Sequence, residues 1–227
     1  MSKIIKKILF RASCINPIYF LKKILQRHWE KYDKKIPKYE LSEKNLVNLK
    51  ALLNREQLLR LLPKNGIVAE IGVDKGEFSE KILNITMPQK LYLIDNWGSK
   101  RYHQQLRKMV ENKFKEEIKK GRVEIKVGLS TEMFNNFEDN YFDWIYIDTS
   151  HSYQTTKIEL EKYSRKVKPG GMITGHDFIM GNWNQMIRYG VIDAVYEFCV
   201  NNNWELVYLT MDNKESPSFG IRRVSVN

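Results

Sequence analysis

The sequence contains few cysteines and no long apolar run. Of its 227 residues only Cys14 and Cys199 are cysteines, and they lie far apart without a CxxC spacing. We therefore expect neither a disulfide framework nor a structural zinc site, and a reducing, cytoplasmic location fits best. No apolar stretch approaches the roughly 20 residues that a membrane-spanning helix needs. Two lysines interrupt residues 4–10, so a secretory signal is not expected either.

Acidic residues are scarce near the N-terminus. Residues 1–38 hold 11 Lys or Arg against only Glu30 and Asp33, a net charge of +9 out of +11 for the whole chain. The rest of the chain therefore has a net charge of only +2. This near neutrality argues against a catalytic domain whose surface is positively charged and binds nucleic acid. An anionic partner would bind the N-terminal segment, and the alternative is a solvated basic tail.

Apolar residues recur at helical spacing within this basic segment, at Ile18, Leu21, Leu25, Trp29 and Tyr32. The spacing predicts an amphipathic helix within an extension formed by residues 1–40. Such a helix can lie on an anionic membrane surface through residues 1–35, peripherally at the inner membrane face, or it can pack on its own domain. A second helix is predicted from Ser42 to Leu62.

Strand and helix patterns alternate through the rest of the chain, within a predicted domain of residues 41–227. The predicted strands are 67–72, 91–95, 123–127, 142–148 and 170–174, separated by helices near 77–84, 100–120, after Thr131 and at 153–166. A helix at 191–201 and two strands at 205–210 and 218–223 follow. This order predicts a doubly wound α/β fold with a mostly parallel seven-stranded sheet and ligand contacts at the carboxyl ends of its strands.

A glycine-containing turn follows the first of these strands. Glu70-Ile71-Gly72-Val73-Asp74-Lys75-Gly76 resembles the ExGxxxG loop of class I S-adenosylmethionine-dependent methyltransferases. Gly72 would let the backbone approach a ligand, Gly76 would allow passage into the helix, and Glu70 can accept hydrogen bonds. A plain strand-to-helix turn is the alternative.

Two later strand ends add to this predicted cofactor site. Asp95 ends the second strand, where nucleoside-binding folds commonly place a carboxylate on the ribose hydroxyls. Trp97 could line the cofactor or be a buried loop aromatic. Ser130, after the third strand, lies in a segment that resembles the one bordering the adenine in this family.

Two patterns are the most informative about the function of the chain. They are IDxxHxY at 147–153 and PGGxxxxHD at 169–177. Their combination resembles the methyltransferase domain 24 group and is similar to the metal-dependent macrocin and catechol types of O-methyltransferase, over about residues 66–180. The resemblance implies that Asp148, which also borders the cofactor, binds a divalent metal such as Mg²⁺ or Mn²⁺ together with His176 and Asp177. His151 is the expected general base. In a metal-free alternative His151 or His176 serves directly as the base, beside Asp177.

The segment after the fourth strand also excludes other chemistries. It contains neither the Pro-Pro-aromatic stretch typical of base N-methyltransferases nor the cysteine that cytosine C5 chemistry needs. The resulting hypothesis is O-methylation of a saccharide, a glycan or a small hydroxylated metabolite. A non-catalytic cofactor-binding or assembly subunit and an RNA methyltransferase are the alternatives, and a homo-oligomer is left open.

Overall fold

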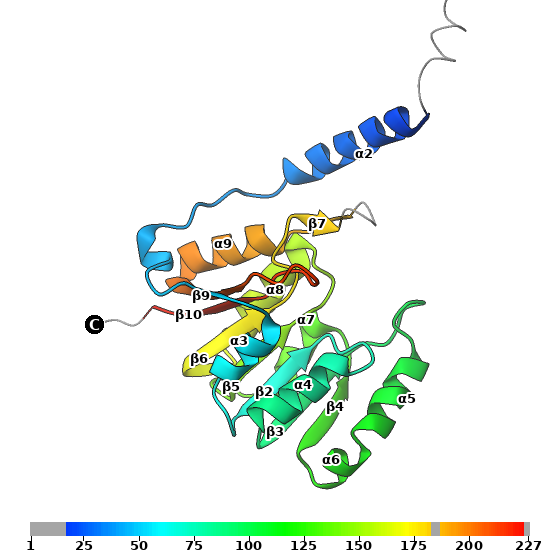
Figure 1. Ribbon diagram of the computed structural model, residues 1–227, viewed down its shortest axis with the longest axis vertical. Helices are drawn as coiled ribbons and strands as arrows, with labels where there is room; N and C mark the ends of the chain where they lie inside the picture. Colours follow the sequence, from blue (N-terminus) through cyan, green and yellow to red (C-terminus); the bar gives the residue numbers. More distant parts are fainter. Residues whose placement is uncertain (1–16, 183–186, 225–227) are drawn as a thin grey trace, which may run out of the picture.

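An eight-stranded, mostly parallel sheet forms the centre of the protein (Figure 1). The computed structural model describes residues 17–182 and 187–224. The strand order is β1-β9-β10-β6-β5-β2-β3-β4, and only β10 runs antiparallel to its neighbours. The strands are β1 (Lys50–Leu52), β2 (Ile67–Ile71), β3 (Lys90–Asp95), β4 (Val123–Val127), β5 (Phe142–Ile147), β6 (Val167–Gly175), β9 (Trp204–Thr210) and β10 (Phe219–Arg223). The predicted doubly wound α/β fold is thus confirmed.

Helices cover both faces of the sheet and create two separate apolar layers. One face packs against α3 (Arg55–Leu61), α4 (Glu77–Thr86) and α5 (Gln104–Lys113), and the other against α8 (Tyr153–Tyr163) and α9 (Val191–Asn202). Short elements complete the connections: α6 (Lys115–Lys119), α7 (Ser130–Met133) and the 3-10 turn η2 (Phe134–Asn136). Because the central strands are buried on both sides, they are apolar runs rather than alternating patterns.

The sheet has eight strands rather than the predicted seven, and the helix predicted at 42–62 is wrong. That segment forms a 3-10 turn, η1 (Glu43–Asn45), then β1 and α3. The buried Asn45 side chain donates a hydrogen bond to the carbonyl of Trp204 at 2.8 Å, which fixes the chain at the sheet edge. Asn54 accepts a bond from the Gln57 amide at 2.9 Å and caps α3. Leu52 therefore lies in β1 and Leu59 in α3, rather than both in one helix.

The N-terminal helix is α2 (Pro17–Asp33), which confirms the predicted amphipathic helix. It extends away from the sheet, and its C-terminal end approaches the body (Figure 1). Tyr32 packs against the core and Ile36 is 4% exposed within it, so the end of the extension is part of the domain's packing. The boundary at residue 40 stays a prediction, and residues 1–16 lie outside the described part. No helix within residues 17–182 and 187–224 has the length and hydrophobicity to cross a membrane.

A two-stranded hairpin that the sequence analysis does not predict lies between β6 and α9. Its strands are β7 (Gly181–Asn182) and β8 (Ile187–Arg188). Each strand is only two residues long, which is too short for an alternating pattern to stand out. The hairpin follows directly on the predicted site residues at the end of β6 and therefore belongs to their surroundings.

Candidate active site

A cavity of about 600 Å³ lies at the carboxyl ends of β2, β3, β5 and β6. Parallel strands all present these ends at one edge of the sheet, which is where doubly wound folds bind ligands. Eight of the nine predicted site residues line the cavity or lie in the loop that borders it: Glu70, Gly72, Gly76, Asp95, Ser130, Asp148, His151 and Asp177. The ninth, His176, is discussed below.

The two glycines of the first loop are required by close packing. Gly72 has φ +91°, and a Cβ there would lie 1.8 Å from the carbonyl oxygen of Asp148, so no other residue allows the β2 and β5 loops to cross. Gly76 has φ +74° where α4 begins, and a Cβ there would lie 2.9 Å from the ring of Phe114. The loop that borders the cavity is therefore shaped by contacts within the protein, before any ligand binds.

Asp95 joins the first two strand-end loops. Its Oδ2 accepts hydrogen bonds from the amides of Val73 and Asp74 at 2.8 and 3.0 Å, and its Oδ1 accepts one from the amide of Trp97 at 3.0 Å. The indole of Trp97 is 1% exposed and donates to the carbonyl of Asp74 at 2.8 Å. Trp97 is therefore a buried loop aromatic that holds the loop in place. Asp95 lines the cavity with a carboxylate already oriented by three amides.

Glu70 lies at the back of the cavity and is 2% exposed. It accepts a short hydrogen bond from the hydroxyl of Ser79 on α4. Burial raises the pKa of Glu70 to about 8, because the charged form has lost its water. Near neutral pH this carboxyl is therefore mainly protonated.

A buried acid under the cavity wall was missed by the sequence analysis. The hydroxyl of Thr149 lies 2.8 and 2.9 Å from the two carboxyl oxygens of Glu159, which also bonds the Ser130 side chain. Burial raises the pKa of Glu159 to about 7. Glu159 thus holds two cavity-lining side chains. Its signal in the sequence is a glutamate on the inward face of α8, alongside Thr156, Leu160 and Tyr163.

At the other end of the cavity, Asp148, His151 and Asp177 come together. The Nε2 of His151 lies 3.1 Å from Oδ2 of Asp177, and one ligand atom from each of the three residues lies within 4.8 Å of the others. Both His151 and Asp177 have positive φ angles, 56° and 53°, a conformation that non-glycine residues rarely adopt outside functional sites or tight turns. The His151 ring packs on Tyr189, with ring centroids 4.7 Å apart.

Charges within this group shift two acids in opposite directions. Burial would raise the pKa of Asp177, but the hydrogen bond from His176 and the charges of both histidines lower it to about 2. Loss of water around the carboxylate raises the pKa of Asp148, even though the same two histidines oppose the shift. Asp177 is therefore the carboxylate that stays charged at every physiological pH.

His176 lies behind the cavity wall. Its Nδ1 is 3.5 Å from an oxygen of Asp148 and 3.5 Å from one of Asp177, and its side chain is 13% exposed. Burial lowers the pKa of His176, but the Asp177 hydrogen bond and the two negative charges outweigh burial, so the pKa is raised. The structure thus brings His151, rather than His176, into the cavity beside the two aspartates. The roles of all these residues stay predictions.

Further residues line the cavity without any motif in the sequence to identify them. Asn182, Ile187 and Tyr189 come from the hairpin region, and Arg55 comes from the first turn of α3. The Arg55 guanidinium lies over the ring of Phe78 at 4.5 Å and pairs with Glu215 at 2.6 Å. Only the fold brings these segments to the strand ends.

Residues 69–178 match the model of a methyltransferase domain family. They form a methyltransferase domain of the S-adenosylmethionine-dependent class. This match confirms the resemblance to the methyltransferase domain 24 group, and the similarity to metal-dependent O-methyltransferases stays a prediction. No curated protein matches the chain in sequence.

Solved structures of low sequence identity share the fold of the methyltransferase. A candidate caffeoyl-CoA O-methyltransferase from Staphylococcus aureus is 18% identical, covers 97% of this chain and 100% of its own, and has a TM-score of 0.52. A candidate rRNA methylase from Clostridium thermocellum is 14% identical over 76% of this chain and 95% of its own, with a TM-score of 0.57. A candidate methyltransferase from Streptococcus mutans, solved with SAH, is 15% identical over 74% and 94%, with a TM-score of 0.53.

Proposed function

We propose that the methyltransferase transfers the methyl group of S-adenosylmethionine to a hydroxyl of a saccharide or a small hydroxylated metabolite. The observation that carries this proposal is the His151–Asp177 pair, at 3.1 Å, on the wall of the cavity next to the cofactor loop. A histidine paired with a carboxylate is the arrangement that orients a general base and stabilises its protonated form.

The cofactor occupies the end of the cavity formed by the β2 and β3 loops. Gly72 and Gly76 shape the loop, Asp95 takes the ribose hydroxyls and Ser130 borders the adenine. Asp95 suits this role because three backbone amides already fix its carboxylate, so little ordering is needed when the ligand binds. Asp148 lies between this end and the acceptor end, as expected of a residue that borders both ligands.

Methyl transfer requires the acceptor hydroxyl to lose its proton as its oxygen attacks the methyl carbon. His151 takes that proton, a C–O bond forms, and the C–S bond breaks with its electron pair going to sulfur. The product cofactor is S-adenosylhomocysteine. Asp177, with its pKa of about 2, remains charged and stabilises the imidazolium that results.

A divalent metal ion is a second candidate for activating the acceptor hydroxyl at this site. The carboxylates of Asp148 and Asp177 and the imidazole of His151 have ligand atoms within 4.8 Å of one another, close enough to bind one ion. An imidazole among these ligands favours Mn²⁺, Fe²⁺ or Zn²⁺ over Mg²⁺. When bound, such an ion would stabilise a developing alkoxide, and His151 would then be a ligand or a base but not both.

The test measures methyl transfer from labelled S-adenosylmethionine to a panel of saccharides and small hydroxylated compounds, with and without EDTA. We expect His151→Ala to lower kcat by about 10²–10⁴-fold with cofactor affinity unchanged, because a base acts in the transition state. His28→Ala, an exposed histidine on α2, is the matched control and should keep full activity.

Other results of these assays would contradict one part of the proposal or favour one of the alternative functions. A fully active His151→Ala enzyme would remove the base assignment. Full activity in EDTA, with no metal found by elemental analysis, would remove the ion. Transfer to RNA but to no compound of the panel would favour an RNA methyltransferase, and cofactor binding without any transfer would favour a non-catalytic subunit.

A further inference from the structure

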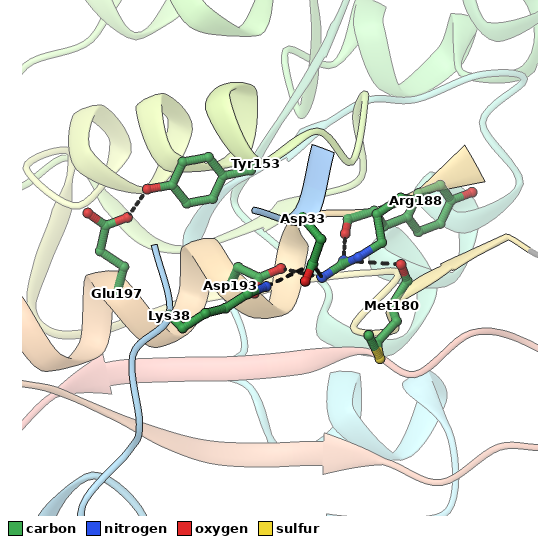
Figure 2. Close-up of polar contacts among 8 residues, drawn as sticks. Asp33, Lys38, Tyr153, Met180, Arg188, Asp193 and Glu197 are labelled. Atoms are coloured by element: carbon green, nitrogen blue, oxygen red, sulfur yellow. Dashed lines mark hydrogen bonds and ion pairs between the residues drawn. The ribbon is translucent and has the colours of Figure 1, made fainter. Parts of the chain in front are cut away.

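The C-terminal half of α2 is fixed to the hairpin that lines the cavity. Figure 2 shows the ion pairs: Nη2 of Arg188 on β8 lies 2.8 Å from Asp33 at the end of α2 and 2.9 Å from Asp193 on α9. Lys38 pairs with the same two aspartates at 2.8 Å each. The Arg188 side chain is only 6% exposed, so this anchor is part of the packed protein.

A second contact holds the same two elements together. A Cβ on Gly181 would lie 3.1 Å from the indole of Trp29, so the Trp29 ring lies directly on β7. Asn182, the next residue of β7, and Ile187 of β8 line the cavity. The position of α2 is therefore tied to the acceptor side of the site.

Within residues 17–182 and 187–224, no element covers the N-terminal half of α2 in this way. Four large apolar side chains, Tyr19, Phe20, Leu21 and Ile24, are 46–58% exposed on two adjacent turns. Phe20 and Ile24 are four residues apart and share one face, and Arg27 and Lys31 continue the same face toward the C-terminal end of the helix. Lys22 and Lys23 lie between the exposed apolar side chains. Exposed aromatic and aliphatic side chains next to basic ones are the composition of a helix that lies in the plane of a membrane interface.

We propose that this half of α2 is a docking surface for an anionic lipid bilayer. Charge and the exposed apolar side chains distinguish a bilayer from the two other candidates for this surface, a second copy of the protein and a nucleic acid. Residues 1–38 carry +9, so two copies meeting through this surface would bring like charges together, whereas an anionic bilayer attracts each of them. A nucleic acid would neutralise the lysines but would leave the four apolar side chains in water. Since α2 is anchored to the hairpin, docking would set the cavity at a defined distance from the lipid surface. This proposal does not depend on the identity of the acceptor.

The experiment uses the full-length protein and flotation with vesicles of phosphatidylcholine alone or mixed with phosphatidylglycerol. We expect flotation with the mixed vesicles and a reduction of about tenfold or more in the partition coefficient for Phe20→Glu/Ile24→Glu, because two apolar side chains are lost and two negative charges are added. The matched control is Val47→Glu/Leu53→Glu, at residues 74% and 76% exposed on the body of the domain, which should float like the wild type.

Cofactor affinity by calorimetry should be the same in all three proteins, which shows that the variants are folded. Wild-type protein that stays with the unbound fraction, or a Phe20→Glu/Ile24→Glu variant that floats normally, would overturn the proposal. A wild-type dimer that this variant converts to a monomer, measured by sedimentation without vesicles, would also overturn it and identify a second copy as the occupant.

Discussion

At the scale of single residues, the buried carboxyl of Glu70 has a consequence for cofactor binding. Its pKa of about 8 means that it is mainly protonated at pH 7. S-adenosylmethionine carries a sulfonium and an ammonium group, and a positive charge nearby favours the carboxylate and lowers its pKa. Binding of the cofactor at pH 7 should therefore release protons.

Calorimetry in two buffers of different ionisation enthalpy measures this release. We expect the apparent binding enthalpy at pH 7 to differ between phosphate and Tris for the wild type, and the difference to shrink at pH 9, where Glu70 has already lost its proton. In Glu70→Gln the dependence on buffer should disappear. Equal enthalpies in both buffers at pH 7 would mean that Glu70 keeps its proton when the cofactor binds.

Asp95 offers a second prediction at this scale. Asp95→Ala removes a carboxylate that orders two loops and, in our proposal, takes the ribose hydroxyls, so cofactor binding should weaken by about 1.5–3 kcal/mol. The control is Asp212→Ala, because Asp212 also accepts a backbone amide, from Lys214 at 2.8 Å, but does not line the cavity. Unchanged affinity of the Asp95→Ala protein would exclude Asp95 from the cofactor site.

At the scale of elements, one almost buried arginine contributes to the link between α2, the hairpin and α9. Arg188 pairs with Asp33 and Asp193, and without it Lys38, whose side chain is half exposed, remains as the cation that pairs with both aspartates. Arg188→Ala loses two charge-assisted hydrogen bonds and should therefore lower the free energy of unfolding by about 1.5–3 kcal/mol in urea denaturation. Hydrogen exchange should accelerate in α2 and the hairpin.

Arg107→Ala provides the comparison for this element. Arg107 pairs with Glu111 one turn along α5, at 2.8 Å, but both side chains are more than a third exposed. An exposed pair of this kind contributes less than about 1 kcal/mol. If Arg188→Ala and Arg107→Ala lower the free energy of unfolding by the same amount, the ion pairs of Arg188 stabilise the protein no more than an exposed surface ion pair does.

At the scale of the whole molecule, the uneven charge predicts how docking depends on salt. The Debye length falls from about 10 Å at 0.1 M to about 3 Å at 1 M ionic strength, so attraction between the +9 segment and anionic vesicles should be largely lost. Flotation should decrease steeply over this range, while cofactor affinity in the nearly neutral domain should change little. Flotation that resists 1 M salt would indicate that apolar contact alone holds the protein.

The order of seven of the eight strands of the main sheet, β2 to β6, β9 and β10, and the edge at which the cavity lies were determined by the sequence itself. Strand and helix periods are local properties, and the strands predicted at 123–127, 142–148 and 205–210 match β4, β5 and β9 to within one residue at each end. The ExGxxxG loop and Asp95 follow strands whose ends must meet at one edge of a parallel sheet, so they identify the cavity without knowledge of the fold's details.

Only the tertiary structure decided which histidine enters the cavity. His151 and His176 both follow strand ends, and the sequence places both at the site, His151 as the general base and His176 as a metal ligand or an alternative base. The positive φ angles of His151 and Asp177 and the packing of His151 on Tyr189 turn the first histidine toward Asp177, while His176 lies behind the wall. Arg55 and Glu159 reach the site, and β1 joins the sheet, through contacts between segments far apart in the chain. Periodicity can place Glu159 on the inward face of its helix, but periodicity and motif spacing report only neighbours along the chain, so they do not show which distant side chains a residue contacts.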